Sequence, residues 1–160
     1  MTLKVFCYFQ NKIKNMKKII TVFALLLFGK LAAIAAEPDI LGIWMVGEKD
    51  YKIELYKNTA GELEGKVVWM KEPNDKKGKP RTDVDNPEES LRSRPVMGLV
   101  TVTKFKWNEA ENEYTNGKVY KKGKTYCGKI KLNADGTLGL RGFLCSITFI
   151  GKSDTWTRVK

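Results

Sequence analysis

The stretch TYCGKIKLNADGTLGLRGFLC, residues 125–145, decides the fold. On both sides of its centre, apolar and polar residues alternate, which is typical of strands with one buried face. A turn at residues 134–136, with Gly136 supplying a positive φ, joins the two strands as a hairpin. The expected register pairs apolar residues across the hairpin: Leu132 with Leu138, Ile130 with Leu140 and Tyr126 with Leu144. A shift of one residue would break this apolar match, so the sequence predicts a single register.

Outward from the hairpin, similar short apolar runs recur along the chain, at 43–46, 51–56, 63–70, 99–107, 119–120, 147–150 and 155–159. Most of the segments between them are short and rich in Gly, Asn and Asp, while 108–117 is expected to be a loop. Neither a helical repeat nor the spacing of βαβ units is present. The pattern therefore predicts an all-β antiparallel meander of eight or nine strands.

The N-terminal segment has the features of a secretory signal peptide. From Met16 it carries two lysines, an apolar run over 19–28, and small residues ending in Ala33-Ile34-Ala35. The run is too short to span a membrane. We expect the true start at Met16, cleavage near Ala35, and an exported protein, periplasmic or secreted, in which 36–160 form a single β-barrel domain.

Composition excludes several classes of function. Without residues 1–35 the chain keeps 23 basic and 18 acidic side chains, and its net charge falls from +11 to +5. These charges are interspersed, so we expect no nucleic-acid partner. Histidine is absent, which excludes Ser-His and Cys-His nucleophile pairs and histidine-ligated metals. We expect neither an enzyme nor a cofactor.

Two cysteines remain in the segment after the leader, Cys127 and Cys145. The hairpin register places them on one face but offset diagonally by two residues, roughly 7–8 Å apart, which is too far for an unstrained disulfide. A bulge near Gly142 would bring them within reach. The sequence leaves both a disulfide and two free thiols open.

The block DVDNPEESLRSRPVMGL, residues 83–99, interrupts the strand pattern after a long polar connection. Asn86 suits a helix N-cap, Pro87 the first helical position, and Pro95 ends the helix, so we expect a short helix over about 86–93. Arg92 and Arg94 could hold an anionic ligand, or could cap the helix and pair with Glu88 or Glu89, which we favour. Asp83, Asp85 and Glu88 do not fit a calcium loop, and we expect no metal.

Several motifs occur together in a characteristic order: GIW at 42–44, GKVVWM at 65–70, DNPEESLRSRPVMGL at 85–99, GKVY at 117–120, GKTY at 123–126, LRGFL at 140–144 and TWTRV at 155–159. In this order the chain resembles the bacterial domain-of-unknown-function family numbered 2147. Lys121-Lys122 departs from the Asp-Pro usual there. The resemblance implies a small exported protein with a lipocalin-like (calycin) up-and-down barrel and no established activity.

A looser similarity to lipocalins implies that Arg158 covers Trp44 at the closed end of the barrel, as a structural pair. An eight-stranded barrel is wide enough either to be filled or to hold one small ligand. We expect the barrel to bind a small, partly apolar ligand such as a lipid or fatty acid. The residues expected to line its binding site are Trp69, Phe105 and Trp107. The alternative is a filled barrel that acts through its surface, as a protein-interaction or envelope-associated module.

Overall fold

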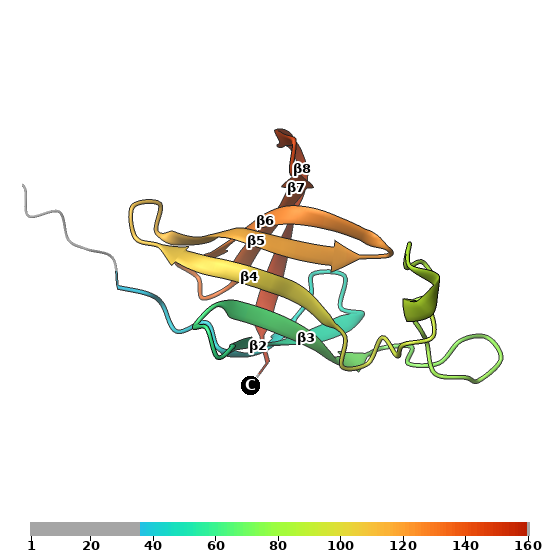
Figure 1. Ribbon diagram of the computed structural model, residues 1–160. Helices are drawn as coiled ribbons and strands as arrows, with labels where there is room; N and C mark the ends of the chain where they lie inside the picture. Colours follow the sequence, from blue (N-terminus) through green and yellow to red (C-terminus); the bar gives the residue numbers. More distant parts are fainter. Residues whose placement is uncertain (1–35, 160) are drawn as a thin grey trace, which may run out of the picture. The chain divides into compact units, whose positions relative to one another are not determined.

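The computed structural model describes residues 36–159, and the expected leader and its cleavage site lie outside this range. The chain forms eight strands in sequence order. They are β1 (Gly42–Met45), β2 (Tyr51–Lys57), β3 (Leu63–Met70), β4 (Val100–Asn108), β5 (Glu113–Lys121), β6 (Lys124–Leu132), β7 (Leu138–Leu144) and β8 (Ile147–Arg158). Figure 1 shows the strands wrapping into a barrel, with the β3–β4 connection extending from one end. Over residues 36–159, no helix is long and apolar enough to cross a membrane.

Each strand pairs antiparallel with the next along the chain, and the last pairs with the first. The pairing of β1 with β8, which closes the barrel, covers a short stretch: Trp44 pairs with Arg158 and Met45 with Thr157. The predicted fold, an up-and-down antiparallel barrel, is therefore confirmed, with eight strands.

The hairpin of β6 and β7 has the predicted register. Ile130 pairs with Leu140 and Leu132 with Leu138, and Gly136 in the turn has φ +80°. Cys145 lies in the turn after β7, where the chain bends back toward β6. A disulfide joins it to Cys127, with 5.0 Å between the two Cα atoms. Because Cys145 lies in the turn and not in a paired strand, it can approach Cys127 more closely than diagonally offset strand residues do.

Two strands differ in extent from the sequence prediction. β5 begins at Glu113, so the second half of the expected loop at 108–117 belongs to this strand. β8 is continuous from Ile147 to Arg158, where two separate strands were expected. The polar residues of β8 pair regularly with β7, Lys152 with Gly142, Ser153 with Arg141 and Asp154 with Leu140, so they do not interrupt the hydrogen-bonded ladder.

The predicted helix over 86–93 is wrong: only a single 3-10 turn forms, at Glu89–Leu91. Asn86 does accept the hydrogen bond expected of a cap, from the backbone N–H of Glu88 at 2.9 Å. Glu88, however, is extended (φ −86°, ψ 115°), and the turn buries none of its residues. So short a helix needs a buried face, and this segment instead folds around the side-chain contacts described below.

The buried core gathers toward the end of the barrel where β4 ends and β5 begins. We call this the closed half; its fully buried side chains include Trp44, Leu63, Phe105, Tyr114, Ile130 and Leu138. Phe105 packs directly against the backbone of two glycines. A Cβ on Gly117 would lie 2.1 Å from the Phe105 ring, and one on Gly128 would lie 2.8 Å from it. The ring therefore fills the centre of the barrel only because both positions lack side chains.

Gly117→Ala should destabilise the protein by about 2 kcal/mol or more, because the added methyl group overlaps a ring with no space to move into. Urea unfolding measures the difference. Gly139→Ala is the matched control, since its Cβ would meet nothing closer than 3.6 Å. Combining Gly117→Ala with Phe105→Leu should recover part of the loss; a Gly117→Ala protein as stable as wild type would contradict this packing.

Candidate functional site

The closed end of the barrel is sealed by Arg158 over Trp44. The guanidinium lies 4.5 Å from the indole centroid, and Trp44 is completely buried. Arg158 also donates to two backbone carbonyls before β1, from Nη1 to Leu41 O and from Nη2 to Asp39 O, both at 2.7 Å. The structure thus brings together the two residues that the sequence paired, and their contacts tie the chain before β1 to the last strand.

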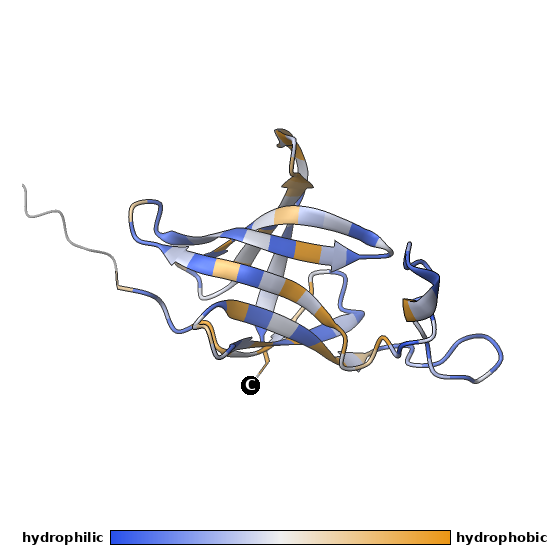
Figure 2. Ribbon diagram, viewed as in Figure 1, coloured by the Kyte–Doolittle hydropathy of each residue, from blue (hydrophilic) through white to orange (hydrophobic). Residues whose placement is uncertain are grey.

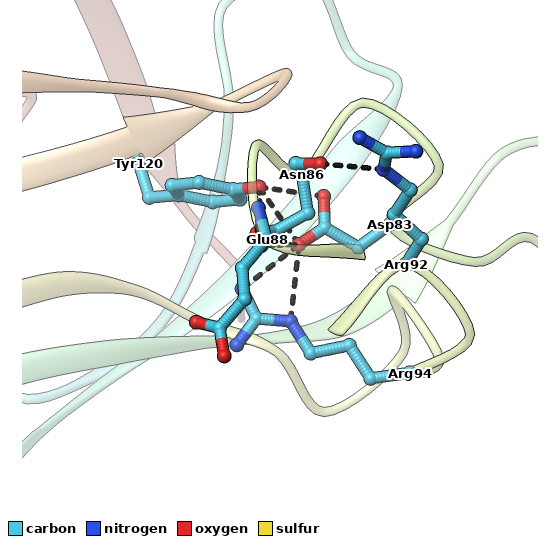
Figure 3. Close-up of polar contacts among 6 residues, drawn as sticks. All are labelled: Asp83, Asn86, Glu88, Arg92, Arg94 and Tyr120. Carbon is cyan, nitrogen blue, oxygen red and sulfur yellow. Dashed lines mark hydrogen bonds and ion pairs between the residues drawn. The ribbon is translucent and has the colours of Figure 1, made fainter. Parts of the chain in front are cut away.

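At the opposite end, the β3–β4 connection is held by a buried carboxylate (Figure 3). Asp83 accepts hydrogen bonds from Asn86 Nδ2 at 2.8 Å and from the Tyr120 hydroxyl at 2.7 Å. Arg94 donates to the same carboxylate from Nε at 3.0 Å and from Nη2 at 2.8 Å. We call these four residues the Asp83 cluster. It draws on two parts of the connection and on the outer face of β5.

The Asp83 cluster fastens the connection to the β5–β6 hairpin. Gly123, in the turn of that hairpin, packs so closely that a Cβ there would lie 1.8 Å from the carbonyl oxygen of Asp85. Burial alone raises the pKa of Asp83, but the hydrogen bonds from Asn86, Tyr120 and Arg94 outweigh it and lower the pKa below its usual value. Asp83 is therefore a fully bonded anion, suited to holding a loop and not to transferring a proton.

The two arginines of this segment have different roles from those expected. Arg94 pairs with Asp83 and lies 5.5 Å from the Tyr120 ring, so the expected pairing with Glu88 or Glu89 is wrong for this residue. Arg92 donates from Nε to the backbone carbonyl of Asn86 at 2.8 Å. Figure 3 shows the end of its guanidinium pointing away from the cluster. Arg94 is occupied by an internal partner, and the two do not converge on one anion site.

The three aromatic residues expected to line a ligand do not share one site. Trp69 lies on the outer face, 36% exposed, with Lys52 Nζ 5.0 Å from its ring. A bulge causes this, because β2 pairs Ile53 with Val67 but Lys52 with Trp69, so Val68 is extra and the side chains beyond it change face. The expectation that Trp69 lines the interior is wrong.

Phe105 and Trp107 do face inward, but in the closed half. Phe105 is packed on glycines, and Trp107 makes an edge contact with Tyr114, with ring centroids 5.3 Å apart. Trp107 Nε1 is buried without a hydrogen-bond partner among residues 36–159. Phe105 is therefore part of the core, and Trp107 packs against it.

Toward the end that bears the β3–β4 connection, Met70 and Val102 are buried, but several other inward-facing side chains are only half-buried. We call this part the mouth half and define it by Tyr51, Val119, Tyr126, Gly142 and Asp154. A Cβ on Gly142 would meet only Tyr126 Cβ, at 4.0 Å, in contrast to the glycines beneath Phe105. Trp156 Nε1 donates to Asp154 Oδ2 at 2.9 Å. Alternation in the sequence placed Tyr51 and Tyr126 on the apolar faces of their strands, and Gly142 was among the small residues expected to leave room inside or to let the barrel bend.

In the part of the chain that the structure describes, no group of three or more acidic or cysteine side chains is placed to hold a metal ion. The mouth half offers aromatic and aliphatic surface, the inner carboxylate of Asp154 and the basic side chain of Lys152.

Asp83→Asn should lower the free energy of unfolding at neutral pH by about 2–3 kcal/mol, because Arg94 loses its charged partner. The pKa of Asp83 is lower in the folded than in the unfolded chain, so its charge stabilises the fold above the unfolded pKa. That contribution is lost as the pH falls through the folded pKa. Urea unfolding at several pH values should show the variant approaching wild type in acid, while Asp85→Asn, at an exposed position, stays close to wild type throughout.

Arg158→Lys should cost about 1–2 kcal/mol, because lysine cannot stack on the indole and donate to both carbonyls at once. Thermal or urea unfolding measures the loss. Arg81→Lys is a suitable control, since Arg81 bonds to Glu72 at the surface and should change stability by less than about 0.5 kcal/mol. Equal effects of the two substitutions would show that Arg158 is not what seals this end.

Two comparisons with known proteins agree with this architecture. A solved structure with the same fold is that of protein HP1028 from the human pathogen Helicobacter pylori, described as belonging to the lipocalin family. The match has a TM-score of 0.63 and 25% sequence identity, and covers 76% of this chain and 84% of that one. The chain matches no curated protein. A family model described as "Uncharacterized protein conserved in bacteria (DUF2147)" matches residues 42–158, so the chain belongs to the DUF2147 family.

Proposed function

We propose that the barrel binds one small, partly apolar molecule in its mouth half. The observation that carries this is the contrast between glycines of the same barrel. Gly117 and Gly128 lie against the Phe105 ring, whereas the inner side of Gly142 meets no atom within 4 Å except Tyr126 Cβ, at that limit. The interior is thus filled in one half and loosely filled in the other, as a cup-shaped binding site requires.

The polar groups of the mouth half favour one orientation of a fatty-acid-like ligand. Asp154 lies on the inner face, bonded to Trp156, and would repel a carboxylate. Lys152 is the next inward-facing residue of β8 toward the rim, paired with Gly142. A lipid would enter with its apolar tail first and leave an anionic head group at the rim beside Lys152.

We also propose that this binding takes place outside the cytoplasm. The leader-like segment at residues 1–35 supports export. The Cys127–Cys145 disulfide supports the same location, since disulfides persist in oxidising compartments.

The alternative, a barrel that acts through its surface, is favoured by a different observation. Three large apolar side chains near the β7–β8 turn are exposed: Leu144, Phe149 and Ile150. The two functions are compatible, because the inner and outer surfaces are separate.

Gly142→Leu should abolish ligand binding by filling the mouth half without disturbing the strand. Protein purified from an exporting host is measured by native mass spectrometry before and after solvent extraction, and then titrated with a dansyl-labelled fatty acid. We expect a removable adduct on wild type, and affinity weakened about tenfold or more in Gly142→Leu.

Gly139→Leu is the matched control. Gly139 lies on the outer face of the same strand and has space for a side chain, so this variant should bind as wild type does. A bare polypeptide mass together with no dansyl signal on wild type would refute the proposed function. Equal loss in both variants would show that the mouth half is not the site.

A further inference from the structure

The β7–β8 hairpin ends in an irregular tip, formed by residues 144–150. Leu144 pairs with Ile147, yet the preceding Phe143 pairs with Gly151, so Thr148, Phe149 and Ile150 have no partners on β7. Gly151 presses against β7, where a Cβ would lie 2.4 Å from the carbonyl oxygen of Gly142. This close contact pushes the unpaired residues outward, as extra residues in a bulge are.

The side chains displaced in this way are hydrophobic. Phe149 is 81% exposed, Ile150 49% and Leu144 42%. Figure 2 shows the tip as a hydrophobic segment standing clear of the mixed surface of the other strands. A cluster of large apolar side chains on a projection marks an interaction site more often than a single exposed residue does.

The tip is held in place by a disulfide, and two of its backbone carbonyl groups accept hydrogen bonds from a side chain. Arg141 Nη2 donates to the carbonyl oxygen of Phe149 at 3.2 Å and to that of Thr148 at 3.4 Å. The disulfide ties Cys145, in the turn of the tip, to β6. A braced loop loses little conformational entropy when it binds, and its bonded carbonyls lower the cost of leaving water.

The surroundings of the tip are basic. Residues 136–153 contain Arg141 and Lys152 but no acidic residue. Lys118 Nζ lies beside the disulfide, 3.0 Å from Cys127 Sγ and 3.2 Å from Cys145 Sγ. The β5–β6 turn carries three more lysines, Lys121, Lys122 and Lys124, of which Lys121 pairs with Glu48.

We propose that this tip docks the protein onto an anionic lipid surface. Phe149, Ile150 and Leu144 enter the interfacial region, and the surrounding lysines and arginine meet the lipid phosphates. A projecting tip with three apolar side chains is too small for the roughly 800 Å² per partner of a stable protein interface. A fluid bilayer, by contrast, adapts to a convex shape, and its negative charge complements that of the tip.

Vesicle flotation with residues 36–160 tests the proposal. This segment holds every strand pair and the disulfide, and it leaves out the leader, which would itself bind lipid. Wild type should float with phosphatidylcholine–phosphatidylglycerol vesicles, less with phosphatidylcholine alone, and less as salt increases. The double variant Phe149→Ser/Ile150→Ser should bind about tenfold or more weakly.

Val84→Ser, at an exposed apolar position on the β3–β4 connection, is the matched control and should float as wild type does. Phe149→Trp supplies a direct readout, since its emission should shift to the blue with anionic vesicles and be quenched by brominated lipid. Near-ultraviolet circular dichroism checks that each variant keeps its fold. No flotation of wild type at low salt would overturn the proposal, as would equal binding by the double variant. Self-association of wild type that the double variant abolishes, without lipid binding, would instead assign the tip to a second copy of the chain.

Discussion

The contact between the Phe105 ring and the bare backbone at Gly117 and Gly128 determines how the inside of this barrel is used. A ring of eight strands encloses more space than one residue from each strand can fill. Phe105 occupies the centre of the closed half, and Trp44 and Tyr114 complete the floor. The proposed binding site lies in the other half, where Tyr51, Val119 and Tyr126 are only half-buried.

Charge, and not apolar packing, shapes the rim of that open half. The long connection between β3 and β4 buries few of its own side chains, so its position depends on Asp83 and the groups that bond to it. The hairpin tip lies at this same end of the barrel, because β7 ends and β8 begins there. The tip projects apart from the β3–β4 connection (Figure 1), so the proposed ligand entrance and the proposed lipid contact use different parts of the surface.

Sequence reasoning succeeded where neighbours along the chain decide the structure, and failed where distant residues do. The β6–β7 register followed from alternation over residues 125–145, because a slip would expose Ile130 and Leu140. Trp69 was misplaced because a bulge at Val68 reverses the facing of the strand, and alternation alone does not reveal it. The helix at 86–93 was wrong because Asn86 also bonds to Tyr120, 34 residues further along the chain. The structural role of Asp83 was missed for the same reason: its partners Tyr120 and Arg94 are close to it only in the folded chain.

The seam that closes the ring joins Trp44, near the start of the folded part, to Arg158, near its end. A chain that is synthesised or exported N-terminus first therefore has no complete barrel until nearly its last residue is available. Until then β1 presents an unpaired edge, and Trp44 has no guanidinium to cover it. Closure of the barrel must therefore wait for nearly the whole chain, and an incomplete chain is the form that most needs protection from aggregation.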